Sequence, residues 1–178
     1  GVALANAWTY GAGSFRDTRT DESAVTIGVT LARAPSFPDP TSDRGEHQFR
    51  FLLAPGADIA SAIELGYRLQ LPVRELSGVS GTPVPSFITT ASPAIVVETV
   101  KLADDGSGDV VVRLYESRGT RTQGRIATAF TAASIIETDL LGNAVPPDVL
   151  VPDSDGFALR MRPFQLVTLR FSGVVVPV

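Results

Sequence analysis

Short runs of alternating apolar and polar residues, separated by glycine- and aspartate-rich turns, fill the second half of this chain of 178 residues. These runs predict strands at 94–102, 109–116, 124–130, 134–137, 156–161 and 164–171. The segments ADDGSGD and SRGTRTQG, which separate the first three runs, have the composition of hairpin turns. Closely spaced strands joined by such turns are typical of an antiparallel β-sandwich, so we expect an all-β fold.

The first half adds two strands and one short helix. Residues 24–31 (AVTIGVTL) and 48–53 (QFRFLL) predict the strands. Asp58 can cap a helix with helical apolar spacing that ends before Pro72. We therefore expect three parts, of which the middle one is rich in Ser, Thr, Gly and Pro. They are part of a central β-sandwich region with the helix at 1–72, an extended crossing segment at 73–93, and a C-terminal β-sandwich at 94–178.

The composition excludes several classes of function. The chain has no cysteine, so disulfides, thiolate zinc sites and cysteine nucleophiles are excluded, and nothing supports an oxidising compartment. With His47 as the single histidine, a multi-histidine metal site is also excluded, and we expect no cofactor. The net charge of −4 without clustered cations argues against nucleic-acid binding. No apolar run approaches the ~20 residues that span a membrane, and we expect a cytoplasmic protein.

Two further features concern the origin of the chain. Lys101 is the single lysine among 15 basic residues, and Ala, Gly, Pro, Val and Arg are abundant, which favours a GC-rich bacterial genome. The chain starts at Gly1 without a methionine, so we expect a piece of a longer protein.

The segment between the two strands of the first half, ARAPSFPDPTSDRGEH, cannot be a regular element, because its prolines remove backbone donors. Defined loops of this length are often functional. Its charged side chains could form a rim that binds sugar hydroxyls, or a site for a hard cation. Alternatively, prolines shape the loop while Asp43 and Arg44 pair locally and His47 leads into a strand. We take Arg33, Asp39 and His47 as candidate substrate-binding residues and expect no catalytic residue.

Other candidates favour structural roles. The run Asp104 to Asp109 lacks the downstream glutamate of an EF-hand and predicts a turn. The glutamates Glu98, Glu116 and Glu137 lie in or at the end of predicted strands and are expected to face solvent or a strand edge. The clean alternation of 164–171 predicts a core strand. Three aromatic residues could form a sugar-stacking platform or an uncovered interface, namely Trp8, Tyr10 and Phe15.

Several segments together resemble a known family. They are TLARAPSFPDPTSDRGEHQFRFLLAPG, the helix that ends at Leu71-Pro72, IVVETVKLADDGSGDVVVRLYESRG, ETDLLGNAV and LRMRPFQLVTLRF. In this order they resemble the C-terminal part of a glycoside hydrolase family 38 α-mannosidase. The resemblance implies a large retaining enzyme whose N-terminal β/α domain, absent from this chain, supplies the catalytic zinc and the aspartate nucleophile. It also implies that an arginine at the position of Arg33 reaches toward the sugar.

Three functions are compatible with these observations. In the first, the chain is the non-catalytic β-sandwich end of a bacterial α-mannosidase, where it supports the catalytic domain and lines its substrate cleft. In the second, it is a stand-alone module that binds mannose-containing glycans. In the third, it is a structural domain that sets the oligomeric state. The expected partners are the N-terminal catalytic domain of the same polypeptide, a mannose-containing glycan, and further copies of the chain in a homo-oligomer.

Overall fold

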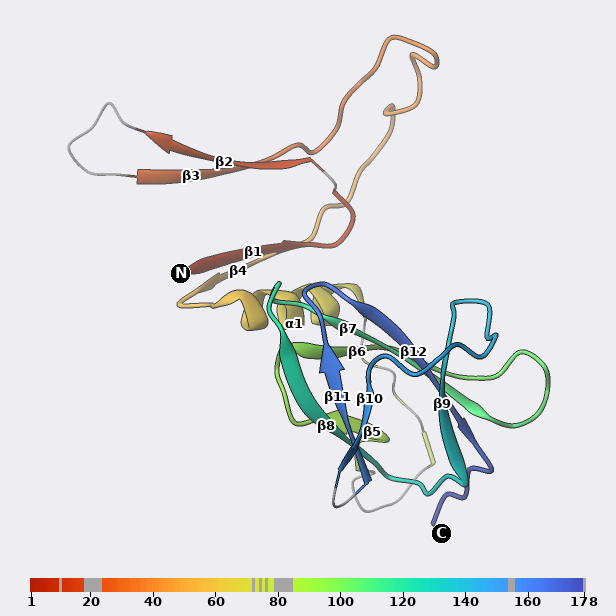
Figure 1. The fold of residues 1–178 in the computed structure, drawn as a ribbon. Coiled ribbons are helices and arrows are strands. Elements are labelled where there is room, and N and C mark those ends of the chain that lie inside the picture. The colour runs from red at the N-terminus through yellow and green to blue at the C-terminus, as the bar shows by residue number, and fades with distance from the viewer. Residues whose placement is uncertain are drawn as a thin grey trace. The chain divides into compact units, whose positions relative to one another are not determined.

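A computed structural model describes residues 1–9, 11–17, 24–71, 73, 75, 77–78, 85–153 and 156–177. The chain divides into two compact units, residues 1–76 and 77–178 (Figure 1). Each unit is described by itself below.

The first unit contains two antiparallel strand pairs and a helix. Strand β1 pairs with β4, and β2 pairs with β3. The elements are β1 (Val2–Asn6), β2 (Ala12–Asp17), β3 (Ala24–Val29), β4 (Phe51–Pro55) and α1 (Ile59–Gln70). The predicted helix is confirmed, because the Asp58 carboxylate caps it by accepting the Ser61 N–H at 2.8 Å. Helix α1 packs against β1 and β4.

The second unit contains two four-stranded sheets in which every strand pair is antiparallel. The strand orders are β6-β7-β12-β9 and β10-β11-β8-β5. The strands are β5 (Ile88–Thr90), β6 (Ile95–Leu102), β7 (Val110–Glu116), β8 (Thr122–Thr128), β9 (Ser134–Thr138), β10 (Leu150–Asp153), β11 (Gly156–Met161) and β12 (Leu166–Ser172).

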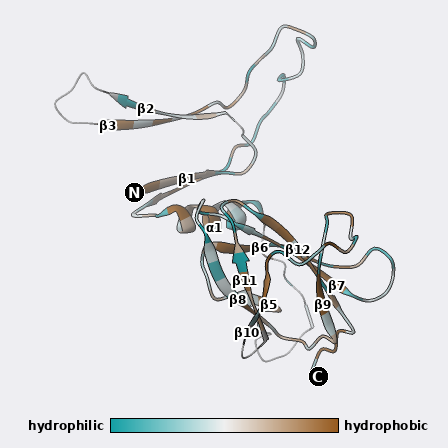
Figure 2. Ribbon diagram, viewed as in Figure 1, coloured by the Kyte–Doolittle hydropathy of each residue, from teal (hydrophilic) through white to brown (hydrophobic). Residues whose placement is uncertain are grey.

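The two sheets of the second unit share one apolar core. Leu114 on β7 and Leu169 on β12 are fully buried, and so are Leu159 and Met161 on β11 of the other sheet. Figure 2 shows hydrophobic residues along β6 and β12, whereas β8 and β11 carry hydrophilic segments. Apolar side chains on one face of each sheet therefore meet between the sheets. The predicted all-β fold, an antiparallel β-sandwich with one short helix, is confirmed in the described residues.

The two predicted hairpins have different outcomes. Residues 103–109 connect β6 to its antiparallel neighbour β7, so this hairpin is confirmed. The hairpin predicted from SRGTRTQG is wrong, because β7 pairs with β6 and β12 whereas β8 lies in the other sheet. Glycine-rich turn composition fits a hairpin and a crossing between sheets equally well, so only the sheet order distinguishes them.

Several strand boundaries also differ from the prediction. Strands β1, β2, β5 and β10 were not predicted, and the strand expected at 48–53 runs from Phe51 to Pro55. Strand β12 begins at Leu166, and Phe164, expected in the core, is 73% exposed with φ +57°. Part of the segment 73–93 lies outside the described residues, although β5 within it pairs with β8. The division into domains at 72 and 93 stays a prediction.

Candidate functional site

A hollow of about 700 Å³ in the first unit contains Arg33. It is formed where the end of β1, the end of β3 and the loop between β3 and β4 come together. Its lining comprises Trp8, Thr9, Gly11, Thr30, Leu31, Ala32, Arg33, Pro35, Phe37, Pro38 and Asp43. The proline-rich loop thus forms one wall of a concave surface, which is the usual shape of a ligand site.

Asp43 fixes the backbone beside Arg33. Its Oδ2 accepts the backbone N–H of Arg33 at 2.9 Å and that of Ala34 at 2.6 Å. Ala34 has φ +45°, in the left-handed region that residues other than glycine rarely adopt. Charge-assisted hydrogen bonds to a carboxylate are stronger than neutral ones, so Asp43 holds the loop in this conformation. The guanidinium of Arg33 therefore extends from a fixed backbone.

Asp39, a predicted substrate-binding residue, stabilises a turn outside this hollow. Its Oδ1 accepts both the N–H of Thr41 at 2.8 Å and the hydroxyl of Thr41 at 2.7 Å. The hydrogen bond from the Thr41 side chain, followed by the one from its backbone, lowers the pKa of Asp39 below its ordinary value. Asp39 and Arg33 do not line the same hollow.

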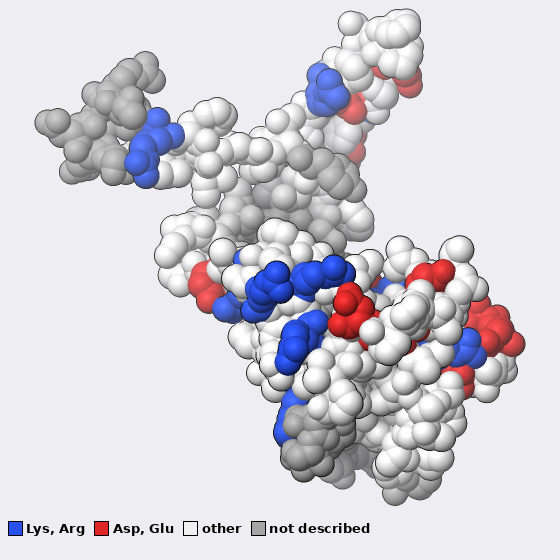
Figure 3. Space-filling model, viewed as in Figure 1, with Lys and Arg blue, Asp and Glu red and all other residues white. Residues whose placement is uncertain are grey.

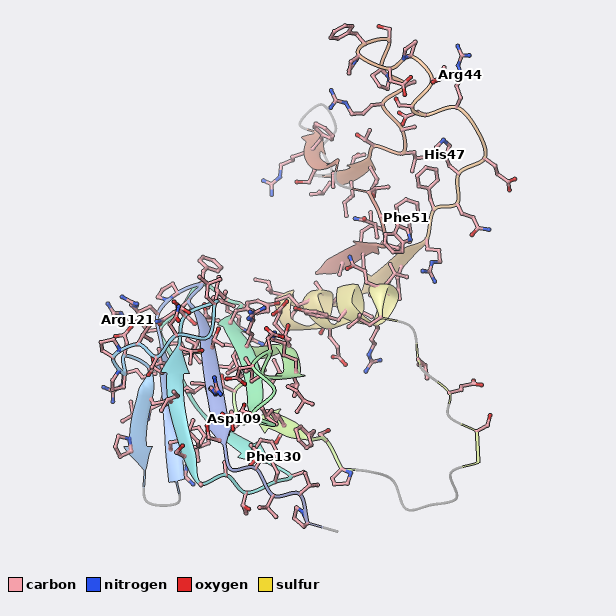
Figure 4. The ribbon with its side chains drawn as sticks, turned by 90° about the vertical axis from the view of Figure 1, so that its right-hand side faces the viewer. Arg44, His47, Phe51, Asp109, Arg121 and Phe130 are labelled. Atoms are coloured by element: carbon pink, nitrogen blue, oxygen red, sulfur yellow. The ribbon has the colours of Figure 1, made fainter. Side chains whose placement is uncertain are left out.

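His47, the third predicted residue, contacts the loop backbone. Its Nε2 lies 3.0 Å from the carbonyl oxygen of Asp43. Its ring stacks on Phe49 with the centroids 6.0 Å apart and the planes inclined by 20°. Figure 4 shows Arg44 at the far end of the loop and His47 on the segment that returns toward β4. His47 is thus linked to the hollow through Asp43 and does not line it.

The predicted aromatic platform is only partly described. Trp8 lines the hollow with Arg33 and is 66% exposed. Phe15 is also exposed but lies on β2, outside the lining, and Tyr10 lies outside the described residues. Because Trp8 and Arg33 line one hollow, that hollow combines an apolar stacking face with hydrogen-bond donors. The sequence did not indicate that Trp8 and Arg33, 25 positions apart, share one surface.

The acidic turn of the β6–β7 hairpin is held by an arginine. Arg170 on β12 donates from Nη2 to Asp105 and from Nε to Asp109, both at 2.6 Å. The hydrogen bond to Asp109, followed by the one to Asp105, raises the pKa of Arg170 above its ordinary value. The carboxylates that superficially suggest a calcium loop therefore bind a guanidinium. Within the described ranges, no group of three or more His, Cys, Asp or Glu side chains is arranged to hold a metal ion.

Two of the three glutamates predicted to face solvent or a strand edge are buried. Glu98 is exposed, but Glu116 is 0% exposed and Glu137 5%. Oε1 of Glu137 accepts three consecutive backbone N–H groups, from Asp148, Val149 and Leu150 at 2.9, 2.7 and 2.7 Å. For these two residues the solvent-facing alternative is wrong, because partners from distant loops satisfy the buried carboxylates, and such partners have no signal in strand periodicity. Glu137 does lie on β9, the edge strand of its sheet, as the other alternative expected. These bonds give both glutamates structural roles.

Comparison with known proteins agrees with this fold. Residues 94–169 match a family model for the glycosyl hydrolases family 38 C-terminal beta sandwich domain. Human alpha-mannosidase 2C1 is 32% identical to the chain over 176 residues, and the mouse protein of that name is 31% identical over 176 residues. Alpha-mannosidase G of Dictyostelium discoideum is 32% identical over 182 residues.

These alignments cover 95% of this chain for the two mammalian proteins and 96% for the Dictyostelium protein. The chain spans only 16% of the length of each relative. The observed sandwich and the matched model identify the kind of domain, which is a C-terminal β-sandwich of the type found in family 38 glycosyl hydrolases. The resemblance of the motifs to the C-terminal region of a glycoside hydrolase family 38 α-mannosidase is therefore confirmed. No helix in the described part of the chain is long and apolar enough to cross a membrane.

Proposed function

We propose that the chain is the non-catalytic C-terminal region of an α-mannosidase that hydrolyses terminal α-mannosides. In this role it supports the catalytic domain and lines the substrate cleft with Arg33. The observation that carries the proposal is the position of Arg33 in a hollow beside Trp8, in a chain that aligns along 95% of its length with alpha-mannosidase 2C1.

The chemistry of the hollow suits a sugar. A guanidinium offers several donors in a rigid fork, which can bind two neighbouring hydroxyl groups. The indole of Trp8 offers a flat apolar surface to the C–H face of a sugar ring. Because Asp43 already fixes the backbone of Arg33 and Ala34, little conformational freedom is lost when the hollow is filled.

The hollow is not suited to catalysis by itself. Retaining hydrolysis requires a nucleophilic carboxylate and an acid/base carboxyl about 5 Å apart across the sugar. Asp43 is the acidic residue among the described lining residues, and its Oδ2 already accepts two backbone N–H groups. In the proposed enzyme, both carboxylates and the zinc ion come from the N-terminal domain, as the family resemblance implies.

The remaining parts of the proposal concern partners and origin. Large apolar side chains of the first unit are exposed, including Val2, Leu31, Phe37 and Leu53, and the catalytic domain would cover part of this surface. Self-association of the isolated chain through the same side chains would give a homo-oligomer. The cysteine-free, arginine-rich composition leads us to propose a cytoplasmic, bacterial protein.

The activity test compares two polypeptides. The complete reading frame should hydrolyse an aryl α-mannoside in a zinc-dependent manner, and the 178-residue chain should show no turnover with or without added zinc. Zinc-dependent turnover by the purified chain would overturn the non-catalytic assignment. A complete polypeptide that is inactive on aryl α-mannosides would overturn the proposed activity.

A second candidate function is a stand-alone module that binds mannose-containing glycans. It is favoured by the exposure of Trp8 next to Arg33 in the same hollow. Titration of the chain with methyl α-mannoside, followed by tryptophan fluorescence, separates the two functions, because Trp8 is the single tryptophan. Saturable quenching that is lost in Arg33→Ala supports the module. A silent titration together with an active complete polypeptide supports the cleft-lining role.

A further inference from the structure

Three arginines and one glutamine occupy neighbouring positions where the start of β8 lies beside the end of β11, in the sheet β10-β11-β8-β5. In the β8–β11 ladder, Arg160 lies opposite Gln123, and Met161 lies opposite Thr122. One position beyond this last pair, the two chains present Arg162 and Arg121. Met161 is only 1% exposed, so alternation along β11 directs its neighbour Arg160 away from the core, and Arg162, just after the strand, is also exposed.

These side chains surround a hollow of about 380 Å³. Its lining comprises Arg121, Thr122, Gln123, Asp148, Arg160, Met161, Arg162 and Gln165. Figure 3 shows basic side chains gathered over β8 and β11, and Figure 4 shows Arg121 among other nitrogen-bearing side chains at the edge of this unit. The gathering is local, because the chain as a whole has a net charge of −4.

Among the described residues, Arg162 is the one arginine of the three that pairs with a carboxylate. Arg162 donates from Nη2 to Oδ2 of Asp148 at 2.9 Å, and Gln165 donates to the same oxygen at 3.2 Å. The Arg162 N–H also donates to Oε1 of Gln165 at 2.8 Å. For Arg121 and Arg160, the described residues provide no acceptor. Within the described lining, the hollow therefore carries two positive charges that no paired carboxylate compensates.

Like charges at neighbouring positions of two strands repel one another, and this repulsion is relieved when an anion lies between them. The guanidinium fork matches the oxygens of phosphate, and several forks can bind different oxygens of one group. The two uncompensated charges match a phosphate dianion. The described lining contains no aromatic side chain for stacking on a neutral sugar. We propose that this hollow binds a phosphomonoester through Arg121 and Arg160.

The backbone around the hollow is fixed before any ligand binds. Arg160 and Gln123 lie within the β8–β11 ladder. Arg121 follows a loop whose Gly119 and Thr120 N–H groups donate to the buried Glu116 at 2.8 and 3.2 Å. Because the donors are held by the sheet and by this carboxylate, binding costs mainly the freedom of the two arginine side chains.

The test uses the 178-residue chain and nuclear magnetic resonance of the arginine Nε–H groups. The probes are inorganic phosphate and glucose 6-phosphate, with glucose as the neutral control and sodium chloride at matched ionic strength. Saturable shifts of Arg121 and Arg160 with the phosphates, and none with glucose, are expected. Equal affinity for inorganic phosphate and glucose 6-phosphate would show that the phosphate group alone accounts for binding. Tighter binding of glucose 6-phosphate would show that the sugar also contributes. Shifts that do not saturate, or that chloride reproduces, overturn the proposal.

Matched variants assign the site. Arg121→Gln and Arg160→Gln should each weaken phosphate binding by roughly 10-fold, since each removes a charge-assisted set of hydrogen bonds. Arg118→Gln removes the same charge from an exposed residue that does not line the hollow, and it should leave the affinity within about 2-fold. Equal losses of affinity in all three variants would show that phosphate binding depends only on the net charge of the chain, and this would overturn the proposal. Arg33 lies in the other unit, so this result is independent of the proposed function.

Discussion

The carboxylate of Glu116 accepts a hydrogen bond of 3.0 Å from the backbone N–H of Phe164, although the two residues are 48 positions apart. The same carboxylate accepts the N–H groups of Arg118, Gly119 and Thr120. It therefore ties the loop after β7 to the turn before β12. Burial by itself would raise the pKa of Glu116, but the hydrogen bonds from Phe164, Arg118, Thr120 and Gly119 outweigh it and lower the pKa.

Glu116→Gln should lower the free energy of unfolding by at least about 2 kcal/mol, because buried N–H donors lose a charged acceptor and face an amide donor instead. Equilibrium urea unfolding measures the difference.

Glu98→Gln provides the control for that variant. Glu98 also lies on a strand of the same sheet, but it is exposed and accepts the neighbouring Thr99 hydroxyl at 2.7 Å. Its replacement should change the free energy of unfolding by less than about 0.5 kcal/mol. Similar losses in both variants would contradict the structural role assigned to Glu116.

The stability of the chain should fall in acid because several carboxyl pKa values are lowered. Hydrogen bonds from Ser107, then the Arg170 guanidinium, lower the pKa of Asp105 to about 2. The Ser172 hydroxyl and then Arg170 lower the pKa of Asp109. Unfolded carboxyls titrate near 3.9, so between about pH 2 and 4 the unfolded chain binds more protons than the folded chain. The free energy of unfolding should therefore rise with pH in this window. Above the window the stabilising contribution of these carboxylates should be complete, and urea unfolding at each pH measures it.

Asp105→Asn tests the contribution of the hairpin carboxylate to this pH dependence. The variant removes one group with a lowered pKa, so the free energy of unfolding should depend less steeply on pH between about 2 and 4. An unchanged slope would show that Asp105 does not titrate at a lowered pKa in the folded chain.

The strand pattern predicts the fold class well and one strand pairing, that of β6 with β7, but it does not predict the other pairings. Alternation over 109–116 and 164–171 correctly indicates two strands with a buried face, and Leu114 and Leu169 lie in the core. The assignment of β7 and β8 to different sheets depends on side-chain packing between sheets, which turn composition does not encode. The register between β8 and β11 places Arg121 near Arg160. Because the sequence does not show this register, it did not reveal the basic hollow.

The candidate site was predicted in part, for equally physical reasons. Prolines correctly indicate an irregular loop after β3, since each one removes a backbone donor. The sequence did not show that Asp43 turns back to bind the N–H groups of Arg33 and Ala34, because a carboxylate in a loop can bind any nearby donor. The substrate-binding roles of Arg33, Asp39 and His47 stay predictions.

The same substitution at two glycines should have opposite effects on stability. A Cβ on Gly124 of β8 would lie 2.9 Å from Cβ of Ser92 and 3.0 Å from Cδ1 of Ile95, so Gly124→Ala should destabilise the sandwich by about 1 to 3 kcal/mol. A Cβ on Gly66 of α1 would meet nothing within 4 Å, and Gly66→Ala should stabilise the helix by up to about 1 kcal/mol. Thermal unfolding measures both, and a stabilising Gly124→Ala would contradict the close approach of β8 to residues 92–95.

Arg33→Ala, made in the complete polypeptide, should lower kcat/KM for an aryl α-mannoside by about 10- to 100-fold, which is the effect of losing one charge-assisted set of hydrogen bonds. The fold should survive, because Arg33 contributes its backbone N–H, and not its guanidinium, to the bond with Asp43. Arg44→Ala is the matched control, since Arg44 is exposed in the same loop and does not line the hollow, so its kcat/KM should stay within about 2-fold of the unmodified enzyme. If Arg33→Ala is as active as Arg44→Ala, the loop does not contact the substrate, and the cleft-lining role of the hollow is wrong even if the complete polypeptide is an active mannosidase.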